Sequence, residues 1–317
     1  METQQNTISR RNFLATAGVL TASAYFFPKE LFAQAKSPVT TIIAEAAKSP
    51  VKVTSLRGNI SIIEGSGGNI LVFTGPDGKL MVDAGISVSE MKIKAALAKI
   101  SKDPIKLLMN THWHFDHASG NEWVHKAGAS IIAHENTKKH LSTTVRVEDW
   151  NYTFPPAPKG ALPSLTFADH HETQFNGEKI ALQHYSPAHT DSDLSIHFPH
   201  ADILHVADTW WNGHYPFIDY VTGGNIKGMI AAAEKNLKNT TKSTIIIPGH
   251  GPIGDRSQLV EYTAMLHGVA DKVTKLKAGG ASLKEVIASK PTKQYDAQFG
   301  TFVINGDFFT NLVYRGV

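Results

Sequence analysis

The chain has 317 residues, of which 42% are hydrophobic, so it is long enough to bury one large core or two modest ones. Its formal net charge is +3, from 31 basic and 28 acidic residues, and neither sign forms a run that would follow a phosphate backbone, which argues against nucleic-acid binding. It has no cysteine, so disulfides and thiolate ligands are excluded, and any metal must be held by carboxylates or by some of the 16 histidines.

Residues 1–35 are predicted to be a targeting segment rather than part of the fold. Arg10 and Arg11 precede an apolar stretch over residues 13–27, and this pattern resembles a twin-arginine export signal. The stretch is shorter than the roughly 18 residues of a membrane-spanning helix, which disfavours an uncleaved anchor. An A-x-A cleavage pattern follows, so we expect a mature chain that begins near Lys36 and is exported by the twin-arginine machinery to the periplasm or beyond.

Residues 36–317 are expected to form a single domain, because strand-like and helix-like runs alternate without a linker or a repeat. A G-P-D-G-K turn joins two of the early strands as a hairpin. An amphipathic helix is predicted over residues 87–101, followed by a buried strand over residues 105–111. The earlier predicted strands are residues 51–56, 60–65, 69–74 and 80–85.

The stretch N-T-H-W-H-F-D-H, which begins at residue 110, follows this buried strand, a common position for site residues. His112 and His114 are separated by one residue, so on an extended backbone both point to the same side and can bind one metal ion. Asp116 and His117 follow as the chain turns, and they can face a second ion at the roughly 3.5–4 Å spacing of two-metal sites. A histidine-rich surface loop is the alternative, and this pattern after a buried strand disfavours it.

Three further metal-capable residues each follow an apolar strand. Because each comes where a buried strand meets a loop, all three can converge on one edge of a pair of sheets. They are His189 after residues 180–184, Asp208 after residues 203–207 and His250 after residues 244–247.

In order and spacing, these residues resemble the landmarks of the metallo-β-lactamase fold hydrolase superfamily, over about residues 51 to 265. The resemblance implies an α+β fold, an αββα sandwich of two mixed β-sheets flanked by helices, with a dinuclear metal site at the sheet edge. It also implies two zinc ions per chain, although manganese or iron suit the same donors. By position, the implied ligands are His112, His114 and His189 for the first ion, Asp116, His117 and His250 for the second, and Asp208 as a bridge.

The resemblance implies an exported metal-dependent hydrolase of small molecules. A hydroxide between two divalent ions is a nucleophile near neutral pH, since zinc lowers the pKa of its bound water to about 7. This hydroxide would attack a lactone, ester or thioester-type carbonyl. Asp116 would both bind a metal ion and orient the hydroxide. A bridging aspartate at Asp208 is typical of thioesterases, lactonases and phosphodiesterases of the fold rather than of its β-lactamases.

Other functions stay open at this point. A metallo-β-lactamase that hydrolyses β-lactam antibiotics is the main alternative, although members with a cysteine at the second zinc are excluded. A phosphodiesterase is another. An iron-dependent sulfur oxygenase on the same fold would leave His117 and His250 without a ligand role, and a binding protein with a silent site is disfavoured because every ligand position is present.

Segments outside the ligand set have two interpretations each. The proline-rich residues 151–167 are either a lid or a plain connector. His134 and His214 are expected to be ordinary histidines, with His214 the better candidate for substrate contact. A long helix is predicted over residues 256–280, covering the outer face of a sheet. Residues 305–317 are predicted to form a final helix that either docks on the core or serves an oligomer contact. Four aromatic residues either line the pocket or pack in the core: Trp210, Trp211, Tyr215 and Phe217.

Overall fold

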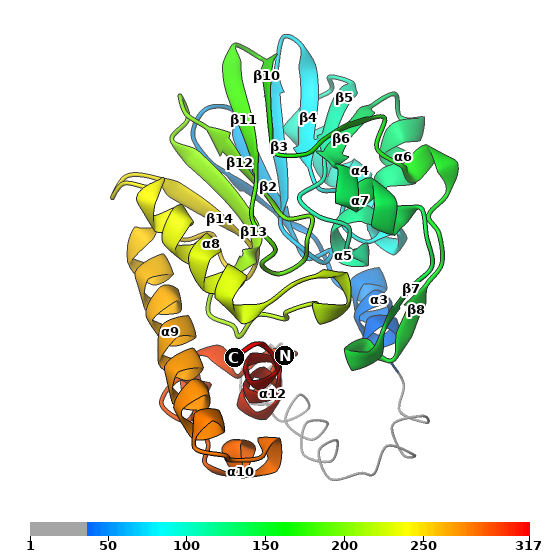
Figure 1. Ribbon diagram of the computed structural model, residues 1–317. Coiled ribbons are helices and arrows are strands. Elements are labelled where there is room, and N and C mark those ends of the chain that lie inside the picture. The colour runs from blue at the N-terminus through cyan, green and yellow to red at the C-terminus, as the bar shows by residue number, and fades with distance from the viewer. Residues whose placement is uncertain (1–36) are drawn as a thin grey trace, which may run out of the picture.

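The computed structural model describes residues 37–317, so the predicted export signal lies outside the described residues. Two β-sheets pack face to face and carry helices on both outer sides (Figure 1). This arrangement confirms the predicted αββα sandwich of the α+β class. Within the described range, no helix combines the length and the apolar character needed to cross a bilayer.

The first sheet has seven strands in the spatial order β1-β2-β3-β4-β5-β6-β9. The first four pair antiparallel through tight turns, whereas β5, β6 and β9 join in parallel because the chain returns through helices between them. The bounds are β1 (Lys52–Ser55), β2 (Ile60–Glu64), β3 (Ile70–Gly75), β4 (Gly78–Val82), β5 (Ile105–Met109), β6 (Ser130–His134) and β9 (Leu165–Phe167).

The second sheet has five strands in the order β10-β11-β12-β13-β14, and only its last pair is parallel. A separate two-stranded hairpin, β7 (Val145–Val147) with β8 (Tyr152–Phe154), extends from the first half of the chain. The bounds of the second sheet are β10 (His170–Phe175), β11 (Glu178–His184), β12 (Leu194–Phe198), β13 (Ile203–Trp211) and β14 (Ile245–His250).

The sandwich interior is built from the inward-facing alternate residues of both sheets. Ile62 and Leu71 of the first sheet lie in one buried cluster with Ile180 and Ile196 of the second. On the outer side of the first sheet, α4 (Glu90–Ile100) and α6 (Asn121–Lys126) bury apolar residues against the strands. The remaining N-terminal-half helices are α3 (Pro38–Lys48), η1 (Ser87–Ser89), α5 (Phe115–Ala118), α7 (Glu135–Leu141), η2 (Glu148–Trp150) and η3 (Lys159–Ala161).

The second sheet is covered by α8 (Ile226–Lys238) and α9 (Arg256–Ala278). A capping box formed by Asp255 and Gln258 starts α9, which confirms the long helix predicted on this outer face. The last helix also docks on the core, because its Phe309 ring is fully buried. The other C-terminal-half helices are η4 (Tyr220–Thr222), α10 (Leu283–Ala288), α11 (Asp296–Phe299) and α12 (Gly306–Gly316).

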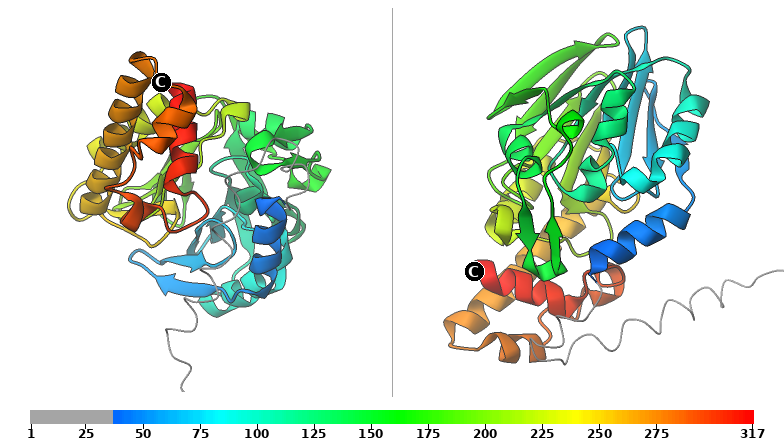
Figure 2. Two further views of the ribbon diagram at one scale, coloured as in Figure 1. Left: turned by 90° about the horizontal axis from the view of Figure 1, so that it is seen from below. Right: turned by 90° about the vertical axis from the view of Figure 1, so that its right-hand side faces the viewer.

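The C-terminal helices gather at the same end of the sandwich as α3. Figures 1 and 2 show α10 and α12 beneath this end, where α3 also lies. Trp113 and Phe115, which flank His114, share a buried cluster with α12, so the histidine-rich segment lies at this end too.

Candidate metal centre

The seven predicted ligand residues come together at this end of the sandwich. His112 and His114 lie in the loop after β5, and Asp116 and His117 lie in the short helix α5 that follows. The other three come from the second sheet. They are His189 in the loop between β11 and β12, Asp208 within β13 and His250 at the end of β14.

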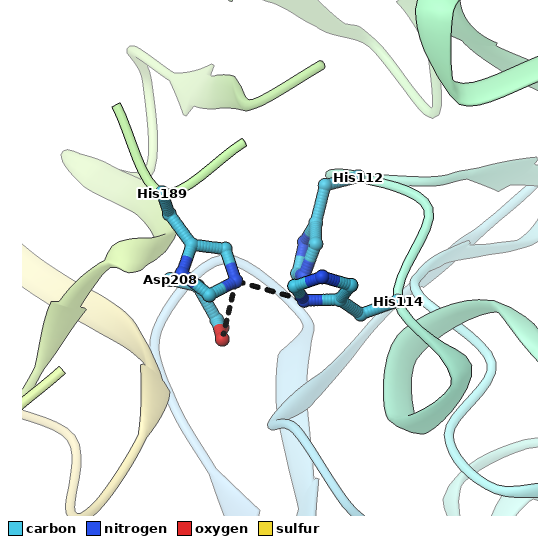
Figure 3. A group of neighbouring side chains, drawn as sticks. All are labelled: His112, His114, His189 and Asp208. Atoms are coloured by element: carbon cyan, nitrogen blue, oxygen red, sulfur yellow. Dashed lines mark hydrogen bonds and ion pairs between the residues drawn. The ribbon is translucent and has the colours of Figure 1, made fainter. Parts of the chain in front are cut away.

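Four of these side chains form a first group whose ligand atoms all lie within 4.8 Å of one another: His112, His114, His189 and Asp208. Figure 3 shows these four side chains pointing toward one another. His189 Nε2 lies 2.8 Å from His114 Nδ1 and 3.4 Å from Asp208 Oδ2. His112 Nε2 is buried and has no hydrogen-bond partner among the described residues. An unpartnered buried nitrogen is costly unless something binds it, so this atom fits a metal ligand.

Asp116, His117 and His250 form a second group beside the first, within the same 4.8 Å limit. His250 Nε2 lies 3.2 Å from Asp116 Oδ2 and 3.4 Å from His117 Nε2. Asp208 faces both groups, because its Oδ1 is 3.1 Å from His117 Nε2 while its Oδ2 is 3.4 Å from His189 Nε2. Its position between the groups suits a bridging carboxylate.

Four of the histidines are fixed by a contact on the ring nitrogen that points away from the centre. Such outer contacts set the tautomer and leave the other nitrogen free to bind a metal. The pairs are His112 Nδ1 with Thr111 Oγ1 (3.0 Å), His114 Nε2 with Asp219 Oδ2 (3.0 Å), His117 Nδ1 with Asp83 Oδ2 (2.8 Å) and His189 Nδ1 with the Phe217 carbonyl (2.8 Å).

Asp83 and Asp219 are positioning residues that sequence reasoning missed. Both are fully buried, and Asp219 also accepts hydrogen bonds from the backbone of Val221 and from the Thr222 hydroxyl. Asp83 directly follows the buried strand β4, which is the same signal that marked Asp208. The predicted strand ran to residue 85 and so hid this signal at Asp83, whereas nothing local distinguishes Asp219 from a helix cap.

The strand that carries Asp208 differs from its prediction. It was expected to end at Ala207, but β13 continues to Trp211 with an irregular register around Ala207. Ala207 has φ 50°, in the left-handed region that non-glycine residues rarely adopt, and its N–H donates to His205 Nδ1. A bulge of this kind redirects the strand locally and aims Asp208 at the centre.

Two glycines allow the close approach that the centre needs. A Cβ on Gly249 would lie 1.8 Å from Asp208 Oδ1, and one on Gly68 would lie 2.1 Å from His117 Cε1. Any larger residue at either position would displace a predicted ligand.

The electrostatics of the centre favour bound positive charge. Burial lowers the pKa of His112 well below its usual range, and His117 nearby adds to this effect. Burial also opposes the charged form of His250, but Asp208 and Asp116 outweigh it and raise the pKa to about 9. For Asp116, burial alone would raise the pKa, yet His117 and His250 lower it to about 2. Divalent ions would satisfy these ionised carboxylates in place of protons, so the donors present fit a divalent metal.

The aromatic residues after Asp208 divide between wall and core. Trp211 Nε1 donates to Asp208 Oδ2 (3.0 Å), and Phe217 has its ring 6.3 Å from that of His114. Trp210 instead packs beside Tyr262, and Tyr215 stacks on Phe309. Trp211 and Phe217 therefore border the centre, while the other two stabilise the core.

The two histidines outside the ligand set have different surroundings. His134 caps α7 and stacks on His184 with ring centroids 3.8 Å apart, so it is structural. His214 lies 4.7 Å from the Phe302 ring, and its Nδ1 has no hydrogen-bond partner within the described chain.

The proline-rich segment also has two parts. Phe154, early in it, packs with its ring 5.4 Å from Trp113, whereas Leu165 at its far end pairs with Ile132 in an edge strand. The far part is therefore sheet rather than lid.

Comparison with known proteins places these observations in a family. Residues 63–252 match the family described as the Metallo-beta-lactamase superfamily. The chain is 25% identical over 226 residues to the linear primary-alkylsulfatase of Pseudomonas sp. (strain ATCC 19151), a match that covers 60% of this chain and 43% of the relative. The chain therefore spans less than half the length of that protein.

A second relative and a solved structure are also similar. The probable metallo-hydrolase YqgX of Bacillus subtilis (strain 168) is 24% identical over 182 residues, covering 56% of this chain and 82% of the relative. The structure of the stereoselective inverting sec-alkylsulfatase Pisa1 from Pseudomonas sp. superposes with a TM-score of 0.63 at 16% identity, covering 90% of this chain and 54% of that one. At that identity the likeness shows the fold alone.

Proposed function

Because the chain belongs to the Metallo-beta-lactamase superfamily, we propose that it is a dinuclear zinc hydrolase that cleaves neutral esters, lactones or thioesters after twin-arginine export to the periplasm. The observation that carries this proposal is the position of Asp208 between the two groups of histidine and aspartate donors: its Oδ1 lies 3.1 Å from His117 Nε2, and its Oδ2 lies 3.3 Å from His250 Nε2 and 3.4 Å from His189 Nε2. When bound, two divalent ions polarise a carbonyl and activate water at neutral pH.

The chain's own residues would hold and orient the reactants. Trp211 Nε1 donates to Asp208 and keeps that carboxylate turned toward both groups. Asp116 Oδ2 lies 3.2 Å from His250 Nε2, which holds the carboxylate in place. Asp116 and His250 are also the two predicted ligands whose side chains reach solvent, so Asp116 is placed to orient the attacking water. This is the catalytic role we propose for Asp116.

The surroundings of the centre support an uncharged substrate. His250 and Asp116 are neighboured by segments 65–69, 211–218 and 249–254, none of which contains a lysine or an arginine. A polyanionic substrate would find no cationic side chain in these three segments, apart from the metal ions.

A second candidate, alkyl sulfate hydrolysis, is favoured by the similarity to the linear primary-alkylsulfatase. The two candidates differ in whether the bond that is cleaved belongs to a carboxylic or a sulfuric ester. The lack of Lys and Arg in the three segments is the reason to place the carboxylic ester first.

One panel assay separates these candidates. The mature protein is loaded with zinc, its metal content is measured, and kcat/KM is compared for a lactone, an ester, a thioester, an alkyl sulfate, a phosphodiester and a β-lactam. We expect about two zinc equivalents and the highest value among the first three substrates. A highest value for the alkyl sulfate would establish the second candidate, and one for the β-lactam would show that the chain is a β-lactamase.

A further inference from the structure

The metal centre reaches solvent on one side. The side chains of His250 and Asp116 are 10% and 11% exposed, while those of His114, His117, His189 and Asp208 are at most 2% exposed. A substrate carbonyl therefore has to approach past His250 and Asp116.

An exposed aromatic ring stands beside this approach. Phe302 lies in the loop between α11 and α12, with its ring 6.5 Å from that of His250 and 6.2 Å from that of Trp211. It is 48% exposed, and within residues 37–317 no other phenylalanine or tryptophan is exposed. Val303 beside it is 45% exposed. This loop lies outside the family match, which ends at residue 252.

The fold holds this exposed ring in place. Phe299 before it and Ile304 after it are both buried, and the Phe299 carbonyl accepts a hydrogen bond from the Tyr215 backbone at 2.8 Å. The loop is thus anchored on both sides of Phe302, and its exposed apolar surface faces solvent beside the centre.

The loop is also uncharged. Residues 300–305 contain no Lys, Arg, Asp or Glu, as is true of segments 65–69, 211–218 and 249–254 around the same ligands. Covering an exposed aromatic ring with an apolar chain removes apolar surface from water, which stabilises the complex, and no charged side chain of these segments has to be desolvated.

We propose that Phe302 and Val303 bind the apolar acyl chain of the substrate and that Phe302 sets a preference for long over short chains. The inference rests on the proposed function and narrows its substrate class to esters of medium-chain or longer carboxylic acids. The acyl chain begins at the reacting carbonyl, which must lie next to His250, so it can reach the Phe302 ring, 6.5 Å from that of His250.

The test measures binding of carboxylate products rather than turnover. Octanoate and acetate are titrated calorimetrically into the zinc-loaded protein and its variants, each checked for metal content and thermal midpoint. We expect wild-type protein to bind octanoate more tightly than acetate. Phe302→Ala should raise the Kd for octanoate about tenfold, or about 1.4 kcal/mol, with acetate unchanged. Phe302→Leu should restore most of the loss, and Val260→Ala, an exposed valine on α9, is the matched control.

Each other outcome overturns the inference. Equal affinity of wild-type protein for the two acids, no change in Phe302→Ala, or an equal loss for both acids would show that Phe302 does not contact the acyl chain. Because no turnover is needed, the binding result is independent of the substrate panel. If the panel rejected ester hydrolysis, a Phe302-dependent affinity would still show that Phe302 binds an apolar chain, but that chain would not be the acyl group of an ester substrate. Conversely, active ester hydrolysis without a Phe302-dependent preference would reject this inference alone.

Discussion

The substitution Asp83→Asn tests whether the metal centre depends on a residue outside the ligand set. Asp83 is fully buried, accepts hydrogen bonds from the Thr111 N–H (2.8 Å) and hydroxyl (2.7 Å), and lies 2.8 Å from His117 Nδ1. Its φ of 61° lies in the left-handed region, which asparagine tolerates as well as aspartate, so the backbone should be preserved.

The expected effect follows from which atoms donate. A carboxylate only accepts, so Asp83 keeps the proton on His117 Nδ1 and leaves Nε2 free for a metal. An asparagine amide turned to His117 donates to Nδ1 instead and drives the proton onto Nε2. We expect metal affinity at the second group to fall about 10- to 100-fold, or about 1.4 to 2.7 kcal/mol.

Asp83→Ala should act on the fold as well. It leaves three buried donors unpaired at Thr111 and His117, and each costs about 1–3 kcal/mol. The free energy of unfolding should therefore drop by roughly 3 kcal/mol or more.

Zinc affinity is measured by competition with a chromophoric chelator, and stability by thermal melting of the zinc-loaded proteins. Asp271→Asn makes the same chemical change at an exposed site on α9 and serves as the control. Tight binding of both zinc ions by Asp83→Asn would refute the reasoning about the tautomer. An Asp83→Ala protein as stable as wild type would refute the count of unpaired donors.

Three further predictions concern the bulge, the metal and the export signal. Ala207→Val should cost about 1–3 kcal/mol of stability and lower activity, because a β-branched residue is strained at φ 50° next to Asp208, whereas Ala207→Gly should keep both. Removing metal with EDTA should abolish activity and lower the thermal midpoint by roughly 5 to 10 °C, and zinc should restore both. Replacing Arg10 and Arg11 together with lysine should retain the precursor in the cytoplasm, as measured by cell fractionation.

Each of these has a clear contrary result. If Ala207→Val and Ala207→Gly had the same thermal midpoint and the same activity, the backbone at Ala207 would not be strained. Activity that survives complete chelation would reject a metal-dependent mechanism. Normal export of the doubly substituted precursor would show that the arginine pair is not a twin-arginine signal.

Much of the fold could be predicted because its signals are local. Alternating and continuous apolar runs predicted β1 to β5 of the first sheet and β11, β13 and β14 of the second, and the 3.6-residue period predicted α9, whereas β6, β9, β10 and β12 were not predicted. The seven ligand candidates were visible for the same reason, since each metal-capable residue follows a buried strand. Helix α3 was missed, because its contacts, such as the Ser37 hydroxyl with the Trp150 carbonyl at 2.6 Å, join distant segments.

The neighbours of the ligands could not be predicted from the sequence. Trp210 and Trp211 are adjacent, yet one packs in the core and the other borders the metal centre, because successive residues of a strand face opposite sides. Nothing in the sequence says which side carries the site.

The sequence by itself determined where many strands lie and which residue types follow them, because strand formation depends on the backbone preferences and apolar pattern of residues that are neighbours in the chain. Only the tertiary structure decided that His117 and His250, 133 positions apart, meet at 3.4 Å, that Asp83 Oδ2 lies 2.8 Å from His117 Nδ1, and that the Phe302 ring lies beside that of His250. These contacts depend on how two sheets pair and pack against the C-terminal helices, and that packing is a property of the whole chain rather than of any short segment.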